Sequence, residues 1–266
     1  MITVKNTENL AGVTIRGDFD DLNNLVDAIY GIVINEYDLS EDSNKSKSKE
    51  LKRYIDMSER VLGFCYDLRH AYQGDREIEF IDNNMNQDKM KWHSTITTAN
   101  NLYYKFNYLY PEMFFIMLAL NELIEVRIKA LTKTSYIYGE GLDKRVIWDD
   151  KITTIRAFQS QFVKCVKSTL SESSFSRWLS TMNEDYIYIH NICGQYLDVL
   201  NINYMKMNKE TRLKKLTSYA KRIAGYSADR EHIEIERVVL DGSNEYQCPK
   251  RDIKLEGVEY PDNILW

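Results

Sequence analysis

Three short stretches near the N-terminus alternate apolar and polar residues, and this period of two predicts β-strands. They are Ala11–Asp18, Glu77–Ile81 and Asn101–Tyr110. The third stretch alternates most strongly, because five apolar or aromatic side chains fall on one of its faces. These are Leu102, Tyr104, Phe106, Tyr108 and Tyr110. We therefore expect a small antiparallel sheet in the N-terminal half.

Three longer stretches of the same half repeat apolar residues with the period of a helix. The first covers residues 18–37 and starts at an aspartate cap. The second covers residues 50–72 and is followed by Gly74, which suits the end of a helix. The third, residues 111–131, is apolar all round between Met113 and Leu120. A helix without a polar face is normally buried, so this helix should be central.

The remaining chain has mostly helical periodicity from residue 145 to residue 207, and residues 209–224 form one more amphipathic helix. The predicted buried seam of that helix consists of Leu213, Leu216, Ala220 and Ile223. The pattern then changes, because His232–Leu240 alternates and is followed by the turn signal DGSN. Since Ile253–Tyr260 also alternates, we predict a hairpin at the C-terminus.

These patterns predict a helix-rich α+β protein with a mostly helical second half. We place a boundary in the glycine-containing loop at Gly139–Gly141. It divides the chain into a mixed α+β unit over residues 1–138 and a helical unit with the hairpin over residues 139–266. The polar segment at residues 40–49 is expected to be a mobile loop.

The composition is that of a globular protein, since 44% of the 266 residues are hydrophobic and 28% are charged. The chain holds 19 tyrosines, which suit packing positions with a polar tip, and only 3 prolines. The net charge is −5, and it is uneven. Residues 1–90 carry 18 acids and 11 bases, whereas the remaining residues carry 22 acids and 24 bases. Because general nucleic-acid binders are basic, the composition argues against that class and leaves room for a local basic patch.

The sequence lacks the motifs of the common cofactor, metal and nucleotide sites. The four cysteines, Cys65, Cys165, Cys193 and Cys248, contain no C-x-x-C pair. A P-loop, a dinucleotide-binding motif and a serine-hydrolase motif are also missing. No stretch reaches 18 apolar residues, and the N-terminus has no apolar signal segment. We therefore expect a cytoplasmic protein with no metal, no cofactor and no membrane contact.

The stretch YDLRHAYQGDRE, residues 66–77, gathers charged side chains around one glycine. Asp67 and His70 are three residues apart on a predicted helix, so their side chains can meet. In an enzyme Asp67 would orient His70 as a general base, and Arg76 would bind an anion. The candidate catalytic residues are Asp67, His70, Asp75, Arg76 and His93. The interpretation that we favour is simpler, namely a helix that ends with ordinary capping.

The predicted helix at residues 209–223 is a second candidate site. Its basic residues are Lys209, Arg212, Lys214, Lys215, Lys221 and Arg222. Such a helix can contact nucleic-acid phosphates or dock an acidic partner. Most helices of this kind are solvated amphipathic helices, so nucleic-acid binding is kept as an alternative.

Three stretches together resemble a family of uncharacterised bacterial proteins, mostly from low-GC bacteria. They are GVTIRGDFDDLNNLVDAIY, VLGFCYDLRHAYQGDRE and NLYYKFNYLYPEMFFIMLALNELI, and they lie in about the first half of the chain. The resemblance implies no assigned activity and no functional residue. The Asn-, Lys- and Ile-rich composition is similar to that of genes of mobile elements and phage-defence islands.

We therefore expect a non-catalytic protein-binding or regulatory protein, in phage defence or mobile-element biology, that binds a protein partner or a second copy of itself. Abundant tyrosines and mixed charge suit protein contacts, and no standard catalytic motif competes with this interpretation. The alternatives are a hydrolase or nuclease that uses the cluster around His70, and a nucleic-acid binder that uses the helix at residues 209–223.

Overall fold

A computed structural model describes residues 1–35, 49–132, 143–183, 187–261 and 263–266. Two expectations fall almost entirely outside these residues. They are the mobile loop at residues 40–49 and the loop with the predicted domain boundary at Gly139–Gly141.

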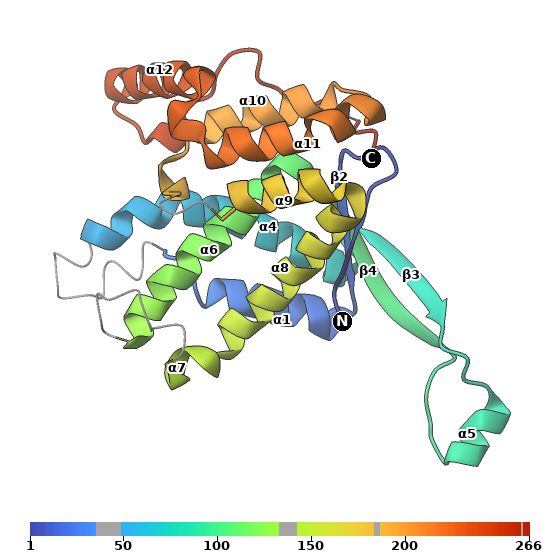
Figure 1. The fold of residues 1–266 in the computed structure, drawn as a ribbon. Coiled ribbons are helices and arrows are strands. Elements are labelled where there is room, and N and C mark those ends of the chain that lie inside the picture. The colour runs from blue at the N-terminus through green and yellow to red at the C-terminus, as the bar shows by residue number, and fades with distance from the viewer. Residues whose placement is uncertain (36–48, 133–142, 184–186, 262) are drawn as a thin grey trace.

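A four-stranded antiparallel sheet forms in the N-terminal half, as the alternating stretches predict (Figure 1). The strand order is β1-β2-β4-β3, and β1 is a short edge strand that the sequence pattern did not indicate. The strands are β1 (Thr3–Asn6), β2 (Gly12–Gly17), β3 (Glu77–Asp82) and β4 (Asn100–Leu109). Val13, Ile15 and Phe106 are buried on one face, which confirms the aromatic face of β4 as a core face.

Helices make up most of the other described residues, so the prediction of a helix-rich α+β protein is confirmed. The helices are α1 (Phe19–Tyr30), α4 (Ile55–His70), α5 (Gln87–His93), α6 (Tyr110–Thr132), α7 (Lys144–Ile147), α8 (Asp150–Thr169), α9 (Glu172–Thr181), α10 (Gly194–Met205), α11 (Lys209–Ala224) and α12 (Arg230–Tyr246). Short helical turns are η1 (Lys52–Tyr54), η2 (Ala71–Asp75), η4 (Ile189–Asn191), η5 (Tyr226–Ala228) and η6 (Lys250–Asp252). None of the described helices is long and apolar enough to cross a membrane.

Helix α6 is central, as its uniformly apolar sequence predicts (Figure 1). Each residue of Met113–Leu120 is at most 5% exposed. The ring of Phe114 lies within about 6 Å of the rings of Tyr110, Phe162 and Trp178. One continuous cluster of buried side chains includes residues from Ile2 to Tyr226, and it therefore draws on both predicted units. The division at residue 138 stays a prediction.

The predicted C-terminal hairpin is wrong, because all of its first strand, His232–Leu240, lies within helix α12. His232, Ile235 and Val239 share one face at helical spacing, and they are the residues that contact the core. Asp229 caps the helix by accepting a hydrogen bond from the Glu231 backbone N–H at 2.9 Å. The apparent alternation of His232–Leu240 thus coincides with a helical stripe. The predicted second strand, Ile253–Tyr260, lies within the described residues and does not form a strand.

The outer half of the sheet projects from the body of the protein (Figure 1). Strand β2 pairs with β4 only as far as Tyr104, whereas β3 pairs with β4 out to Asn100. The end of β4 beyond Tyr104 therefore pairs with β3 alone. Helix α5 lies at the tip, where Asn86 caps it and Ser94 ends it in a left-handed conformation. We call residues 77–103 the arm.

Candidate functional site

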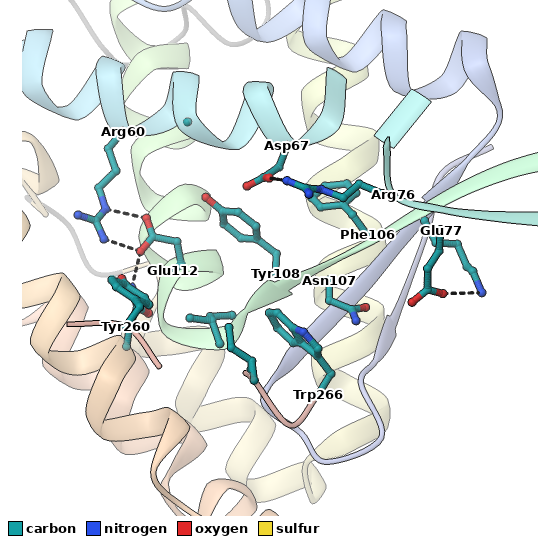
Figure 2. Close-up of a pocket in the computed structure, with 15 residues that line it drawn as sticks. Arg60, Asp67, Arg76, Glu77, Phe106, Asn107, Tyr108, Glu112, Tyr260 and Trp266 are labelled. Carbon is teal, nitrogen blue, oxygen red and sulfur yellow. Dashed lines mark hydrogen bonds and ion pairs between the residues drawn. The ribbon is translucent and has the colours of Figure 1, made fainter. Parts of the chain in front are cut away.

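A cavity of about 770 Å³ lies between α4, β4, the start of α6 and the C-terminal segment, residues 253–266 (Figure 2). Its volume is within the range of about 300–1,000 Å³ that is usual for ligand pockets. Charged, amide and aromatic groups all contribute to its wall. The lining residues are Arg60, Gly63, Asp67, Arg76, Glu77, Lys105, Phe106, Asn107, Tyr108, Leu109, Glu112, Asn201, Tyr260, Ile264 and Trp266.

The cavity lies where β3 stops short of the end of β4. Strand β3 begins at Glu77, which pairs with Lys105, while β4 continues to Leu109. The chain reaches β3 from α4 through a turn at Gly74, whose φ of 90° favours glycine. Because this turn leads the chain away, residues 106–109 of β4 have a paired strand only on the β2 side.

The direction of the β4 backbone groups follows from the hydrogen bonding. The Tyr110 N–H donates to the Ala11 carbonyl at 3.1 Å, next to the β2 ladder. In an antiparallel strand alternate residues direct both backbone groups to the same side. The backbone groups of Tyr108 therefore point to β2, and those of Asn107 and Leu109 point to the side where β3 is missing. The Asn107 N–H and C=O and the Leu109 N–H therefore face a side with no paired strand among the described residues. Leu109 directly precedes α6, so its carbonyl is placed to accept the first hydrogen bond of that helix.

A buried ion pair forms one end of the cavity (Figure 2). Arg60 donates from Nε and Nη2 to the two Glu112 oxygens, both at 2.6 Å, and from Nη2 to Asp198 at 2.9 Å. Asn201 Nδ2 donates to Glu112 at 2.6 Å and to the Tyr260 hydroxyl at 3.0 Å. The Tyr260 hydroxyl donates to Asp198 at 3.0 Å. This network joins α4, α6, α10 and the C-terminal segment.

The same network sets the charge state of its members. Burial alone would raise the pKa of Glu112, but the Arg60 charge, its hydrogen bonds and that of Asn201 outweigh burial and lower this pKa. Burial and the nearby acids, foremost Glu112, raise the pKa of the Tyr108 hydroxyl well above its ordinary value. Tyr108 is therefore a neutral donor at physiological pH, and in Figure 2 its hydroxyl lies between Glu112 and Asp67.

The residues predicted around His70 are paired differently from the expectation. Asp67 accepts a hydrogen bond from Arg76 at 2.8 Å, and His70 Nδ1 lies 2.7 Å from Asp75. Asp67 therefore does not orient His70. Asp67 and Arg76 line the cavity, whereas His70 and Asp75 are not among its lining residues. The contacts of His70 agree with the favoured interpretation of a helix end.

His93 lies apart from the other candidate catalytic residues. It is the last residue of α5, at the tip of the arm, while His70 ends α4 in the body (Figure 1). The β3–β4 pair extends outward from the body, and His93 therefore lies away from His70. The five candidates do not converge on one cleft.

Some basic residues of α11 are exposed to solvent, and the others are held by contacts within the protein. The exposed ones are Lys209, Lys214, Lys215 and Lys221. Arg212 is only 2% exposed and donates to the backbone carbonyls of four residues. These are Asn9, Tyr204, Met205 and Leu265. Arg222 binds Asp229 at 2.8 Å and also pairs with Glu231.

The predicted apolar seam of α11 is corrected at one position. Leu213 is 42% exposed, and the neighbouring Arg212 takes the buried place. A guanidinium carries five N–H donors, so it can satisfy carbonyls at the end of α10 and in the two terminal segments at once. Arg212 is therefore a structural residue and is unable to reach a phosphate.

No sequence pattern indicated the two buried histidines of the structure. His190 pairs with Glu122, and both side chains are less than 10% exposed. His232 Nε2 accepts a hydrogen bond from the Cys193 backbone N–H at 3.0 Å. Burial lowers the pKa of His232, which is thereby kept neutral. The partners lie 68 and 39 residues away in the chain, so no local spacing could have indicated these pairs.

Among the described residues no group of three or more His, Cys, Asp and Glu side chains could hold a metal ion. The acids at the start of α1 serve as caps. Asp18 accepts from the Asp21 N–H at 2.8 Å, and Asp21 accepts in return from the Asp18 N–H at 3.3 Å.

Comparison with known proteins gives one match. A family model described as "Domain of unknown function (DUF6904)" matches residues 2–266. The match extends over nearly the whole chain rather than its first half. No curated protein and no solved structure matches.

Proposed function

Because the chain belongs to the DUF6904 family of domains of unknown function, we propose its function from its own surface. It is a non-catalytic protein-binding or regulatory protein that holds its partner with the arm. The observation that carries this proposal is the set of large apolar side chains exposed along the arm. Their exposed fractions are 46% for Ile78, 71% for Phe80, 86% for Trp92, 100% for Ile96 and 37% for Leu102.

The arm is built for contact rather than for packing within the chain. The core face of β4 continues outward beyond the helices that cover it (Figure 1), so the cross-strand partners Phe80 and Leu102 have no described helix above them. None of the residues of α5 is buried. Exposed apolar patches of this kind mark interaction sites, and aromatic anchors contribute most to protein–protein affinity.

The charge of the arm favours a protein over a nucleic acid. Residues 77–103 contain four acids, namely Glu77, Glu79, Asp82 and Asp88, and two lysines, Lys89 and Lys91. A nucleic-acid surface would need a basic excess. Strand β3 is also an edge strand of the sheet, and edge strands are sites where a partner strand can pair.

The setting that we propose is the bacterial cytoplasm, in phage defence or mobile-element biology. The support is the composition and the resemblance of the sequence stretches described above. The partner is another protein or a second copy of the chain.

The two alternatives have less support. A hydrolase or nuclease would need its candidate residues in one cleft, but His70 lies outside the cavity and His93 lies on the arm. A nucleic-acid binder would have to use the four exposed lysines of α11, because Arg212 is buried and Arg222 is paired.

A shortened arm is expected to abolish partner binding while the protein stays folded. The Asn83 N–H donates to the Ala99 carbonyl at 3.0 Å, so a two-residue Asn-Gly turn can replace residues 84–98 and close a regular hairpin. The replaced segment contributes nothing to the buried core. We therefore expect an unchanged melting temperature and the loss of the partner when the protein is captured from its native cells.

The matched control is Ile233→Asp, which removes an apolar side chain that is 52% exposed on α12. This variant should retain the partner. Sedimentation of the purified protein at several concentrations separates self-association from binding to another protein. Retention of the same partner by the shortened chain would contradict the proposal.

A further inference from the structure

The cavity beside β4 has the features of a peptide site. It presents a strand edge without a partner strand, made of the Asn107 N–H and C=O and the Leu109 N–H, to a space that no described strand fills. Asn201 also lines this space, and its Oδ1 is buried without a hydrogen-bond partner among the described residues. A ligand that fits must therefore offer N–H donors and C=O acceptors at the spacing of a strand.

We propose that this cavity binds the C-terminal end of an extended peptide, which continues the line of β3 and pairs with residues 107–109 of β4. Strand addition to an open edge is a common mode of peptide recognition. The proposal depends on the cavity and not on the arm, so each of the two can fail while the other holds.

The direction of the peptide follows from the sheet. A peptide in line with β3 runs antiparallel to β4, as β3 does. Its carboxyl end then lies beside Arg76, the residue before β3, which lines the cavity together with Lys105. Its amino end lies toward Leu109.

Arg76 is the group that would bind the terminal carboxylate. Its guanidinium carries five N–H donors, and among the described residues it donates only to Asp67. Its side chain is 43% exposed, so it can turn toward a ligand. Lys105 is less available, because it lies near both Glu77 and Glu79, at 3.3 and 3.8 Å. An arginine that binds a carboxylate through two parallel hydrogen bonds gives both strength and direction.

The side-chain preference follows from the alternation of strands. Arg76 is bonded to Glu77 and takes the place opposite Phe106, so the last residue of the peptide lies opposite Asn107. The second-last side chain lies opposite Tyr108 and shares the face of its ring. That ring lines the cavity, so an apolar side chain fits this position. The last and third-last residues lie opposite Asn107 and Leu109, whose backbone groups point toward the peptide.

Gly63 provides a variant that fills the cavity without disturbing the fold. It lines the cavity from α4, and a Cβ added to it would meet no atom within 4 Å. Replacing glycine within a helix also favours the helical state. Gly63→Leu should therefore fold at least as well as the wild type while its side chain occupies the space of the peptide.

The test uses fluorescein-labelled pentapeptides with Leu or Phe at the second-last position and a mixture of residues elsewhere. The peptide that binds most tightly is selected from this pool. Its affinity is measured by fluorescence anisotropy, once as the free acid and once as the C-terminal amide. We expect the amide to bind about tenfold more weakly, which is typical for loss of a charged hydrogen bond. Arg76→Gln should weaken binding of the free-acid peptide by a similar factor. It should also remove the difference in affinity between the free acid and the amide.

Two further variants complete the test. Gly63→Leu should abolish binding with no loss of melting temperature. Arg69→Gln, on the same helix but outside the cavity lining, should leave the affinity unchanged. Equal binding of acid and amide, binding retained by Gly63→Leu, or no binding by any member of the pool at about 1 mM would overturn the proposal.

Discussion

Replacing Arg60 with methionine is expected to lower the free energy of unfolding by about 3–5 kcal/mol at neutral pH, which is the usual cost of breaking a buried ion pair. Arg60 makes both hydrogen bonds to the Glu112 carboxylate at 2.6 Å, and the Glu112 side chain is 9% exposed. Without Arg60 the carboxylate would stay buried beside Asp198, another acid. Chemical denaturation at pH 7 measures the loss.

The pH dependence of stability distinguishes this cause from lost packing. In the wild type burial alone would raise the pKa of folded Glu112, but the charge and hydrogen bonds of Arg60 outweigh burial and lower this pKa below its ordinary value. The pair therefore contributes stability that is present above the unfolded pKa and is lost as the pH falls through the folded pKa. In Arg60→Met, burial is left to raise the pKa of Glu112. The difference in stability between the two proteins should therefore shrink as the pH falls from 7 toward 4.

The double variant Arg60→Met/Glu112→Leu is the matched control. Replacing both partners with apolar residues removes the unpaired charge, and such replacements are often close to neutral. We expect it to recover most of the stability that the single variant loses. A single variant as stable as the wild type would show that the ion pair does not hold these helices together.

Phe80→Asp is expected to weaken partner binding by roughly 10- to 100-fold, the range for a central aromatic anchor of an interface. Phe80 is 71% exposed on the arm, and its neighbour across the sheet, Leu102, is also exposed. The free energy of unfolding should change by no more than about 0.5 kcal/mol, as for other surface substitutions. Binding is measured with the captured partner, and unfolding with denaturant.

Trp92→Ala, at the tip of the arm, is the companion variant, because Trp92 is 86% exposed and belongs to α5. The account predicts a loss of affinity in both variants, and a loss with Phe80→Asp alone would contradict a contact at the tip. Unchanged affinity in both variants would contradict a role of these side chains.

The strands and the central helix could be predicted because their patterns are local. The period of two in Asn101–Tyr110 and the unbroken apolar run of Met113–Leu120 depend only on neighbouring residues, and β4 and α6 follow them. His232–Leu240 shows the limit of this reasoning. Ile235 and Val239 fit both the alternating pattern and the helical stripe, whereas Ile233 is exposed on the helix. The choice of helix depends on packing against distant residues.

The candidate site could not be predicted from local sequence patterns, because it also depends on contacts between distant residues. Arg60, Glu112, Asn201 and Tyr260 come from four separate parts of the chain, and only the fold brings them together. Asp67 and His70 have the spacing of a helical pair, yet Arg76 and Asp75 offer each of them a better partner. The burial of Arg212 likewise depends on carbonyls from both ends of the chain.

Site-specific photo-cross-linking in the native cells tests most directly whether the arm is the partner-binding surface. A photoreactive amino acid is placed at Ile96, which is fully exposed at the arm tip, and separately at Ile233 on α12 as the control. The account predicts one discrete cross-linked product from position 96 and none of that size from position 233. No product from position 96, or the same product from both positions, would contradict it.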